Sequence, residues 1–285
     1  MINATRYRLS AEINRQSQLA RDIGRLQTEI STGKRILAPS DDPTAAARVS
    51  EIGRTQADDK AYSRNLDTAA AQAQRADTAL AGVTLAVDRA RELMLSAASG
   101  TVTADERAIV AGELRALAEQ ITALANSRDS RGAALFSAGD PLEIPVAAGI
   151  AVVAVGSRAE IFDTVGTVDG PQSFVDILNG AADALMLDDI VLRQAATDEA
   201  LIELEAAVEH VAALAGHHGV RAARIDAMQD RAAESKVQLQ EERLGLEAID
   251  FPEVVAMLES KKLSLEAAQA VFARVNQTSL FDLLR

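Results

Sequence analysis

The sequence predicts a mainly α fold, in which an elongated, coiled-coil-like bundle of long antiparallel helices carries a small β-rich insert. Apolar residues recur at alternating steps of four and three along much of the chain, which is the 3.5-residue repeat of a coiled-coil seam. Aromatic residues make up only 3% of the 285 residues, so Ala, Leu, Val and Ile must fill the core between closely spaced helices. Prolines and glycines interrupt the helical pattern between residues 137 and 172.

The clearest helix is predicted from Pro43 to about Ser99. Asp42 is a favourable N-cap, and proline is favoured at the first helical position. At about 1.5 Å per residue this helix would extend for roughly 85 Å, which implies an elongated particle. About half of its seam is alanine, so a partner helix can approach closely. The seam consists of Tyr62, Leu66, Ala69, Ala73, Ala76, Leu80, Val83, Val87, Ala90, Met94 and Ala97.

A second helix is predicted to form a hairpin with the first. Gly100 ends the first helix, and Thr103 with Glu106 has the spacing of a capping box. The segment 137–172 follows, with short β-rich runs that predict one or two hairpins and too few residues for a core of their own. The second seam consists of Val110, Leu114, Leu117, Ile121 and Leu124, and the β-rich runs are Ile144–Val146, Ile150–Val155 and Val165–Val168.

Helix resumes near Ser173 and continues to a break at Asp250 and Pro252, after which a terminal helix follows. The seam of the long helix includes Leu201, Leu204, Val208, Val211, Ala215, His218, Ala222 and Ile225. The seam of the last helix consists of Val254, Leu258, Leu265, Ala268, Phe272 and Val275. Lys261 is a polar interruption of this last seam. We predict an inner domain of terminal helices at 1–42 and 250–285, a helical rod at 43–136 and 173–249, and an outer insert at 137–172.

Composition and charge exclude several classes of protein. Cysteine is absent, which excludes disulfides, thiolate metal sites and thiol catalysis. The formal net charge of −13 argues against nucleic-acid binding, no apolar run is long enough to predict a membrane span, and no cleavable signal is expected. Residues 1–35 carry a balance of +4 and residues 137–210 a balance of −12, so we expect the middle of the chain to face water.

Few residues are candidates for chemistry. His210, His217 and His218 lie within nine residues, but a metal site would need a carboxylate from elsewhere, and His218 falls on the predicted seam. Ser31–Lys34 fits S-x-x-K without the companion motifs of acylating enzymes, and a helix end with a glycine cap explains it. The adjacent acids Asp41 and Asp42 do not form an acid–base pair on a helix. We therefore predict no catalytic, cofactor-binding or metal-binding residues, and a metal-binding protein or enzyme is the weaker alternative.

Each terminal helix carries an apolar stripe that a single helix of about 35 residues cannot bury alone. The stripe of the first helix includes Leu19, Ile23, Leu26 and Ile30. An exposed stripe of this kind marks an association surface. The alternative is a terminal hairpin that folds back on the body of the same chain.

Four segments resemble conserved parts of the bacterial flagellin superfamily, in the order found there. The segment from Ile30 to Pro43, ISTGKRILAPSDDP, resembles its N-terminal signature. Ala125–Phe136, Gly219–Ile225 and Leu265–Val275 with the following Ser-Leu-Phe are similar to further segments of the two conserved arms. Within the superfamily, the sequence is most similar to the hook-associated protein 3 branch, the hook–filament junction proteins.

The resemblance implies a non-enzymatic structural subunit of the bacterial flagellum, exported unfolded through the flagellar type III apparatus and located outside the cell. It implies self-assembly into a helical ring between a hook-side hook-associated protein and flagellin, with a flagellar export chaperone on the C-terminal helix. It implies no cofactor, nucleic acid or membrane. A filament flagellin with a minimal outer domain is the alternative. We expect the assembly contacts to include Ile23, Leu26, Ile30, Leu265, Phe272, Val275, Leu280 and Phe281.

Overall fold

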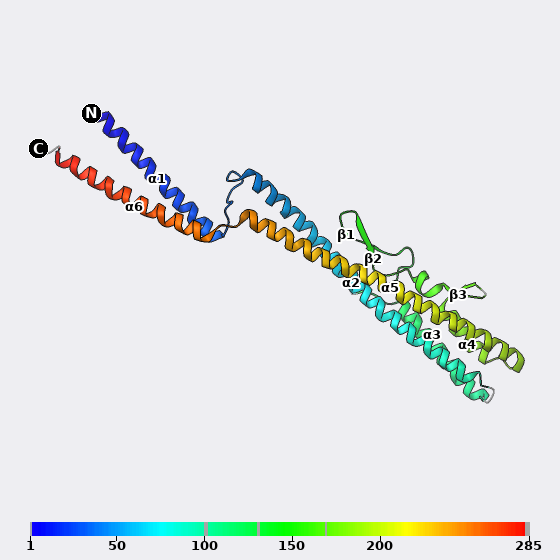
Figure 1. The fold of residues 1–285 in the computed structure, drawn as a ribbon. Coiled ribbons are helices and arrows are strands. Elements are labelled where there is room, and N and C mark those ends of the chain that lie inside the picture. Colours follow the sequence, from blue (N-terminus) through cyan, green and yellow to red (C-terminus); the bar gives the residue numbers. More distant parts are fainter. Residues whose placement is uncertain (1, 100–101, 130–131, 169, 283–285) are drawn as a thin grey trace. The chain divides into compact units, whose positions relative to one another are not determined.

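The computed structural model describes residues 2–99, 102–129, 132–168 and 170–282; of residues 2–6, 8, 9 and 275–282 it describes the backbone alone. The described chain is mainly α, with long helices and two small antiparallel hairpins, which confirms the predicted fold class (Figure 1). Two compact units are present, one formed by residues 1–57 with 235–285 and one by residues 58–234. We call them unit 1 and unit 2.

Unit 1 contains the two terminal helices. Helix α1 spans Ile2–Thr32 and helix α6 spans Phe251–Asp282, and the two pack side by side in antiparallel directions (Figure 1). Gly33 ends α1 with a φ of +67°, a left-handed conformation that glycine adopts without steric cost. Asp250 caps α6, where its Oδ1 accepts a hydrogen bond of 3.2 Å from the Glu253 amide.

Unit 2 is built on the C-terminal part of helix α2, which spans Pro43–Ala97. Every residue of the predicted α2 seam is buried except Tyr62, which is half-buried. The buried face is wider than one seam, since Ala79, Ala86 and Leu93 are also buried beside it. A widened face of this kind is typical of a helix that packs against more than one neighbour.

Helix α3 spans Ala104–Ala125 and starts with the predicted capping box of Thr103 and Glu106. Of its predicted seam, Leu114 and Ile121 are fully buried, while Val110, Leu117 and Leu124 are partly buried and pack against the same core. The smaller residues Ala111, Ala118 and Ala125 are also buried, so the buried face of α3 is wider than the predicted seam. One reason is the close packing of α3 against helix α4, Phe174–Leu185, where small side chains let two backbones approach.

The insert shares the core of unit 2 and has none of its own. Strands β1, Glu143–Ala147, and β2, Ile150–Val153, form one hairpin, and β3, Val165–Thr167, and β4, Gly170–Gln172, form another. A five-residue π-helix, Ala159–Asp163, lies between them. Its Phe162 meets Phe136 edge to face, with ring centroids 4.9 Å apart, and both rings belong to the cluster formed with the helices.

Helix α5, Ile190–Glu247, is continuous over 58 residues. Asp189 caps it by accepting hydrogen bonds from the amides of Val191 and Leu192, which lowers the pKa of its carboxyl. The predicted α5 seam is wrong at Ala215, which is exposed, while the neighbouring Leu214 is buried. Burial of Leu214 removes more apolar surface from water than burial of Ala215 would, which favours the orientation in which Leu214 faces the core.

Candidate assembly surface

The predicted assembly residues of α1 lie on the face that meets α6. Leu26 is buried, while Ile23 and Ile30 are half-buried. On α6, Leu258 is buried and Leu265 and Phe272 are half-buried. The structure thus places these side chains along the α1–α6 contact. Val275, Leu280 and Phe281 lie outside the residues whose side chains are described.

Lys261 interrupts the apolar seam of α6, as the sequence indicates. Its Nζ lies 2.8 Å from Oδ2 of Asp22 on α1. Both side chains are more than a third exposed, so the pair contributes little to stability. A single polar pair in an apolar seam instead favours one register between the two helices.

A second apolar stripe follows the opposite side of α6. Positions 256, 260, 263, 267 and 270 are again separated by steps of four and three, Val271 lies beside the last of them, and all are apolar except Ser260. No described part of the chain covers its members, which are all exposed, with Leu263 68% and Val271 63% accessible. We call this stripe the outer face of α6, and it consists of Ala256, Ser260, Leu263, Ala267, Ala270 and Val271.

The sequence prediction missed the outer face, although a signal for it was present. The step pattern 256, 260, 263, 267, 270 is visible in the sequence, but most of its members are alanines beside the larger residues of the first seam. A helix with apolar residues on opposite sides is normally buried on both. The corresponding side of α1, which is the side opposite its seam with α6, is polar by comparison and includes Ser10, Asn14, Ser17 and Arg21.

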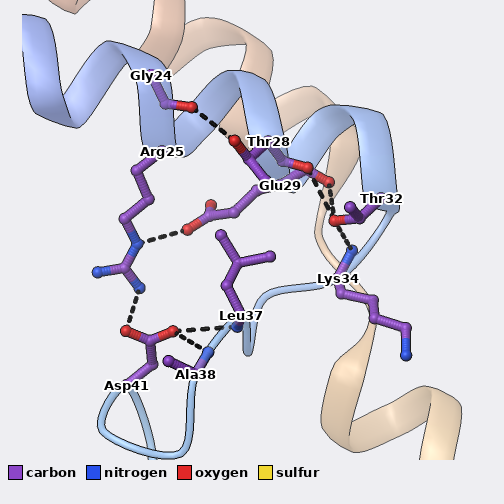
Figure 2. Close-up of polar contacts among 9 residues, drawn as sticks. All are labelled: Gly24, Arg25, Thr28, Glu29, Thr32, Lys34, Leu37, Ala38 and Asp41. Carbon is purple, nitrogen blue, oxygen red and sulfur yellow. Dashed lines mark hydrogen bonds and ion pairs between the residues drawn. The ribbon is translucent and has the colours of Figure 1, made fainter.

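The connector between α1 and α2, residues 33–42, contains the charged residues of the segment 30–43 that resembles the flagellin N-terminal signature (Figure 2). Asp41 Oδ2 accepts hydrogen bonds from the amides of Ala38 and Leu37, at 2.9 and 3.0 Å. These bonds, with a weaker contribution from the Arg25 guanidinium 3.5 Å away, hold the pKa of Asp41 below its usual value. Arg25 also bonds Glu29 at 2.8 Å, so the connector is tied back to α1.

The connector is also bound to the end of α5. The Arg35 amide donates to the Glu247 carbonyl at 2.7 Å, and the Arg35 guanidinium donates to the Leu246 carbonyl at 2.9 Å. A cation is favourable at these unpaired carbonyls because the helix dipole is negative there. Lys34 lies 3.2 Å from Glu247. Partial burial opposes ionisation of Glu247, but hydrogen bonds from Lys34 and Arg243 outweigh it and lower its pKa.

Nearby, Arg48 on α2 makes a two-pronged contact with Glu242 on α5, at 2.6 and 2.9 Å. The hydrogen bonds from Arg48 lower the pKa of Glu242, and the two carboxylates that Arg48 contacts raise its own pKa. All of these charges are paired with each other. The arrangement therefore fixes the course of the chain.

The remaining candidates for chemistry are explained by local structure. His218 is buried, with Nε2 2.8 Å from the Ala73 carbonyl, while His217 is exposed. His210 packs on Phe174, and its partial burial lowers its pKa. Asp42 caps α2 at the Ala45 amide. Among the described residues no group of three His, Asp or Glu side chains could hold a metal, and no helix is long and apolar enough to cross a membrane.

Known proteins resemble this chain in sequence over both of its helical arms. The family model described as bacterial flagellin N-terminal helical region matches residues 3–140, and the bacterial flagellin C-terminal helical region matches residues 201–284. Flagellar hook-associated protein 3 of Salmonella typhimurium is 34% identical over 113 residues, which are 40% of this chain and 36% of that protein. The protein of the same name from Escherichia coli is 34% identical over 109 residues, 38% of this chain and 34% of that protein. The match thus spans about a third of the length of these curated relatives.

Solved structures show the same fold at low sequence identity. Flagellar hook associated protein-3 from Legionella pneumophila aligns with a TM-score of 0.61 at 12% identity, over 68% of this chain and 99% of that one. FlgL of Xanthomonas campestris aligns with a TM-score of 0.58 at 15% identity, over 66% of this chain and 99% of that one. The two matched regions cover both ends of the chain and most of its helices. The chain therefore belongs to the bacterial flagellin superfamily, a family of structural and non-enzymatic proteins, and is similar to its hook-associated protein 3 branch.

Proposed function

We propose that this chain is a structural subunit of the bacterial flagellum that joins a hook-side hook-associated protein to the flagellin filament. The observation that carries the proposal is the outer face of α6. It continues for about four turns, and no described part of the chain covers it. Exposed apolar surface of this extent is typical of a protein that associates with others.

In this proposal the two sides of α6 have different tasks. The seam toward α1, which includes Ile23, Leu26 and Ile30 on α1 and Leu265 and Phe272 on α6, holds the hairpin together and presents the outer face. Val275, Leu280 and Phe281, further along the chain, belong to the same set of proposed assembly residues. The outer face then packs against a neighbouring subunit. If the outer face meets a different surface of the neighbour, the contact is heterologous, and its repetition produces helical order.

The proposed partners are further copies of this chain, a hook-associated protein on the hook side, and flagellin on the filament side. Before assembly, a flagellar export chaperone covers α6, and the chain passes unfolded through the flagellar type III apparatus to the cell exterior. Support comes from the relatives and from the packing of the terminal hairpin. Most of its seam residues are only half-buried, so the hairpin costs little to unfold and gains stability when a partner covers it.

Deletion of the gene in the source bacterium tests this function. A junction subunit is required before flagellin can polymerise, so the deletion strain should release unpolymerised flagellin into the medium while its hooks remain intact. The wild-type chain should restore filaments. The chain should also be recovered from isolated flagella at the hook–filament boundary.

A filament flagellin with a minimal outer domain is the second candidate. The observation that favours it is the insert, which packs on the helical core and forms no separate domain. In that case the deletion would shorten or thin the filaments, and the medium would hold no excess flagellin. That result would contradict the junction role.

A further inference from the structure

The turn between helices α4 and α5, at one end of unit 2, exposes a dense group of apolar side chains (Figure 1). Turns that face water are normally built from Gly, Pro, Asn, Asp and Ser. Here five large apolar residues within seven positions are 40–71% exposed. We call them the apolar turn, and they are Met186, Leu187, Ile190, Val191 and Leu192.

The first turn of α5 is open on several sides. Ile190, Val191 and Leu192 are consecutive, so their side chains point about 100° apart around the helix axis. All three are at least 62% exposed, so no described part of the chain covers this end of the helix. Apolar surface gathered in this way is typical of a site that contacts another molecule.

Hydrogen bonds hold the apolar turn in one conformation. Asp189 Oδ1 accepts bonds of 2.8 and 3.1 Å from two amides in the first turn of α5. The Arg193 guanidinium donates to the carbonyl oxygens of Leu187 and Asp188, at 2.7 and 3.2 Å. The backbone that presents the apolar side chains is therefore already ordered, which reduces the entropy lost when a partner binds.

The apolar surface continues along α5. A hollow of about 320 Å³ has Ala195 and Ile202 in its apolar lining. Leu192, Ala195 and Ile202 are three and seven residues apart and so share one side of the helix. From Ile190 to Ile202 this surface extends for about 18 Å, the length of about 12 residues of a second helix.

The charges around this surface are acidic. Arg193 is the only basic residue from Phe174 to Glu205, against eight acidic residues, and its guanidinium is engaged in the turn. Asp198 and Glu199 line the hollow, and their carboxylates make no hydrogen bond or ion pair in the described chain. A partner that covers the apolar residues therefore gains most if it brings cations to these two acids.

We infer that the apolar turn and the adjoining side of α5 bind a basic amphipathic helix of another protein. Its apolar face covers the apolar turn, Ala195 and Ile202, and its Lys or Arg side chains pair with Asp198 and Glu199. The same surface of a second copy is a poor partner, because its acids would face these acids. The inference goes beyond the proposed function, whose contacts lie on α6.

Two synthetic peptides of about 14 residues test the site. Both have leucine at the same helical positions, and the remaining positions are lysine in one and glutamate in the other. Fluorescence anisotropy measures their binding to the dilute full-length chain at about 0.15 M salt. The lysine peptide should bind at least about tenfold more tightly than the glutamate peptide. Absence of binding, or equal binding of the two, would overturn the inference.

Val191→Ser locates the site without a change of charge. It should weaken binding of the lysine peptide by at least about fivefold, because apolar contact is lost. Val220→Ser is the matched control, since Val220 lies on the same helix and both valines are 71% exposed. Both variants should keep wild-type helix content by circular dichroism. Equal effects on peptide binding would show that the peptide does not bind at the apolar turn.

The two acids are tested in the same way. Asp198→Asn with Glu199→Gln should weaken binding of the lysine peptide by at least about fivefold. Asp226→Asn with Asp230→Asn removes two charges from other exposed positions of α5 and should change it little. Equal losses would mean that the net charge of the chain attracts the peptide, and would contradict the local pairing.

Sedimentation of the chain without peptide tests whether a second copy is the occupant. Val191→Ser and Val220→Ser should sediment like the wild type. A loss of self-association in Val191→Ser alone would assign the apolar turn to a second copy and overturn the inference. Failure of the junction role is read separately from the deletion strain and leaves peptide binding unchanged.

Discussion

Alanine determines how closely the helices of unit 2 approach each other. Ala69, Ala73, Ala76 and Ala90 of α2 are each at most 4% exposed, and His218 of α5 reaches the Ala73 carbonyl at 2.8 Å. At these four buried positions the neighbouring helices leave room for a methyl group and little more. The low aromatic content of the sequence follows from the same geometry, because little space remains for large rings.

Replacement of Ala76 by leucine should destabilise unit 2 by about 1–3 kcal/mol, since a fully packed site must accommodate three additional carbons. Chemical denaturation followed by circular dichroism measures the difference. Ala81→Leu is the matched control, because Ala81 is exposed on the same helix and should change stability little. Equal effects at the two sites would show that the α2 face is loosely packed.

Asp41 makes the connector sensitive to acid. Its folded pKa lies below the ordinary value of 3.8, chiefly because the Ala38 and Leu37 amides bind the ionised form. The stabilisation is therefore complete above the ordinary pKa and is lost as the pH falls through the folded value. Asp41→Asn should lower the melting temperature at pH about 6, and the difference from wild type should shrink in acid below the folded pKa.

The control for this measurement is Asp230→Asn, because Asp230 is exposed on α5 and has no partner in the described chain. It should cause no pH-dependent difference. A difference between wild type and Asp41→Asn that stays constant from pH 6 into acid would contradict the role given to the carboxylate.

At the scale of elements, heptad spacing predicted where the helices lie more accurately than it predicted which side of each helix faces the core. The α2 seam was predicted because its polar and apolar sides are distinct. In α3, leucine and alanine occupy adjacent positions, and the structure buries Ala118 fully and Leu117 partly, a width that the heptad pattern does not predict. The second stripe of α6 was missed for the same reason.

Substitution of Leu263 by aspartate should separate the two sides of α6. Leu263 is exposed in the monomer, so the variant should keep wild-type helix content and melting temperature but lose assembly. Phe272→Asp, on the seam toward α1, should abolish incorporation and also loosen the terminal hairpin, while unit 2 stays folded. Circular dichroism of the monomer and recovery of the chain in isolated flagella measure the two effects.

Gln269→Asp is the matched control, because it adds the same carboxylate to an exposed position of α6 away from the outer face. It should assemble normally. Assembly of Leu263→Asp at the wild-type level would show that the outer face contacts no neighbour.

At the scale of the whole molecule, the sequence predicted the order of the helices and the site of the insert but not the contacts that tie distant segments together. The bonds from Arg35 to Leu246 and Glu247 join residues more than 200 positions apart, and no periodicity indicates them. The resemblance of residues 30–43 to the flagellin signature identified the family, yet the signature's bonds to α5 were visible only in the structure.

The central claim is that the terminal helices remain incomplete until neighbouring subunits cover them. Amide hydrogen exchange on the purified, dilute full-length chain and on its assembled form tests this most directly. In the monomer, α1 and α6 should exchange rapidly while the helices of unit 2 exchange slowly, and assembly should protect α6 on every turn of its outer face. Terminal helices in the dilute monomer that are as strongly protected as α2 in unit 2, with no further protection on assembly, would contradict the account.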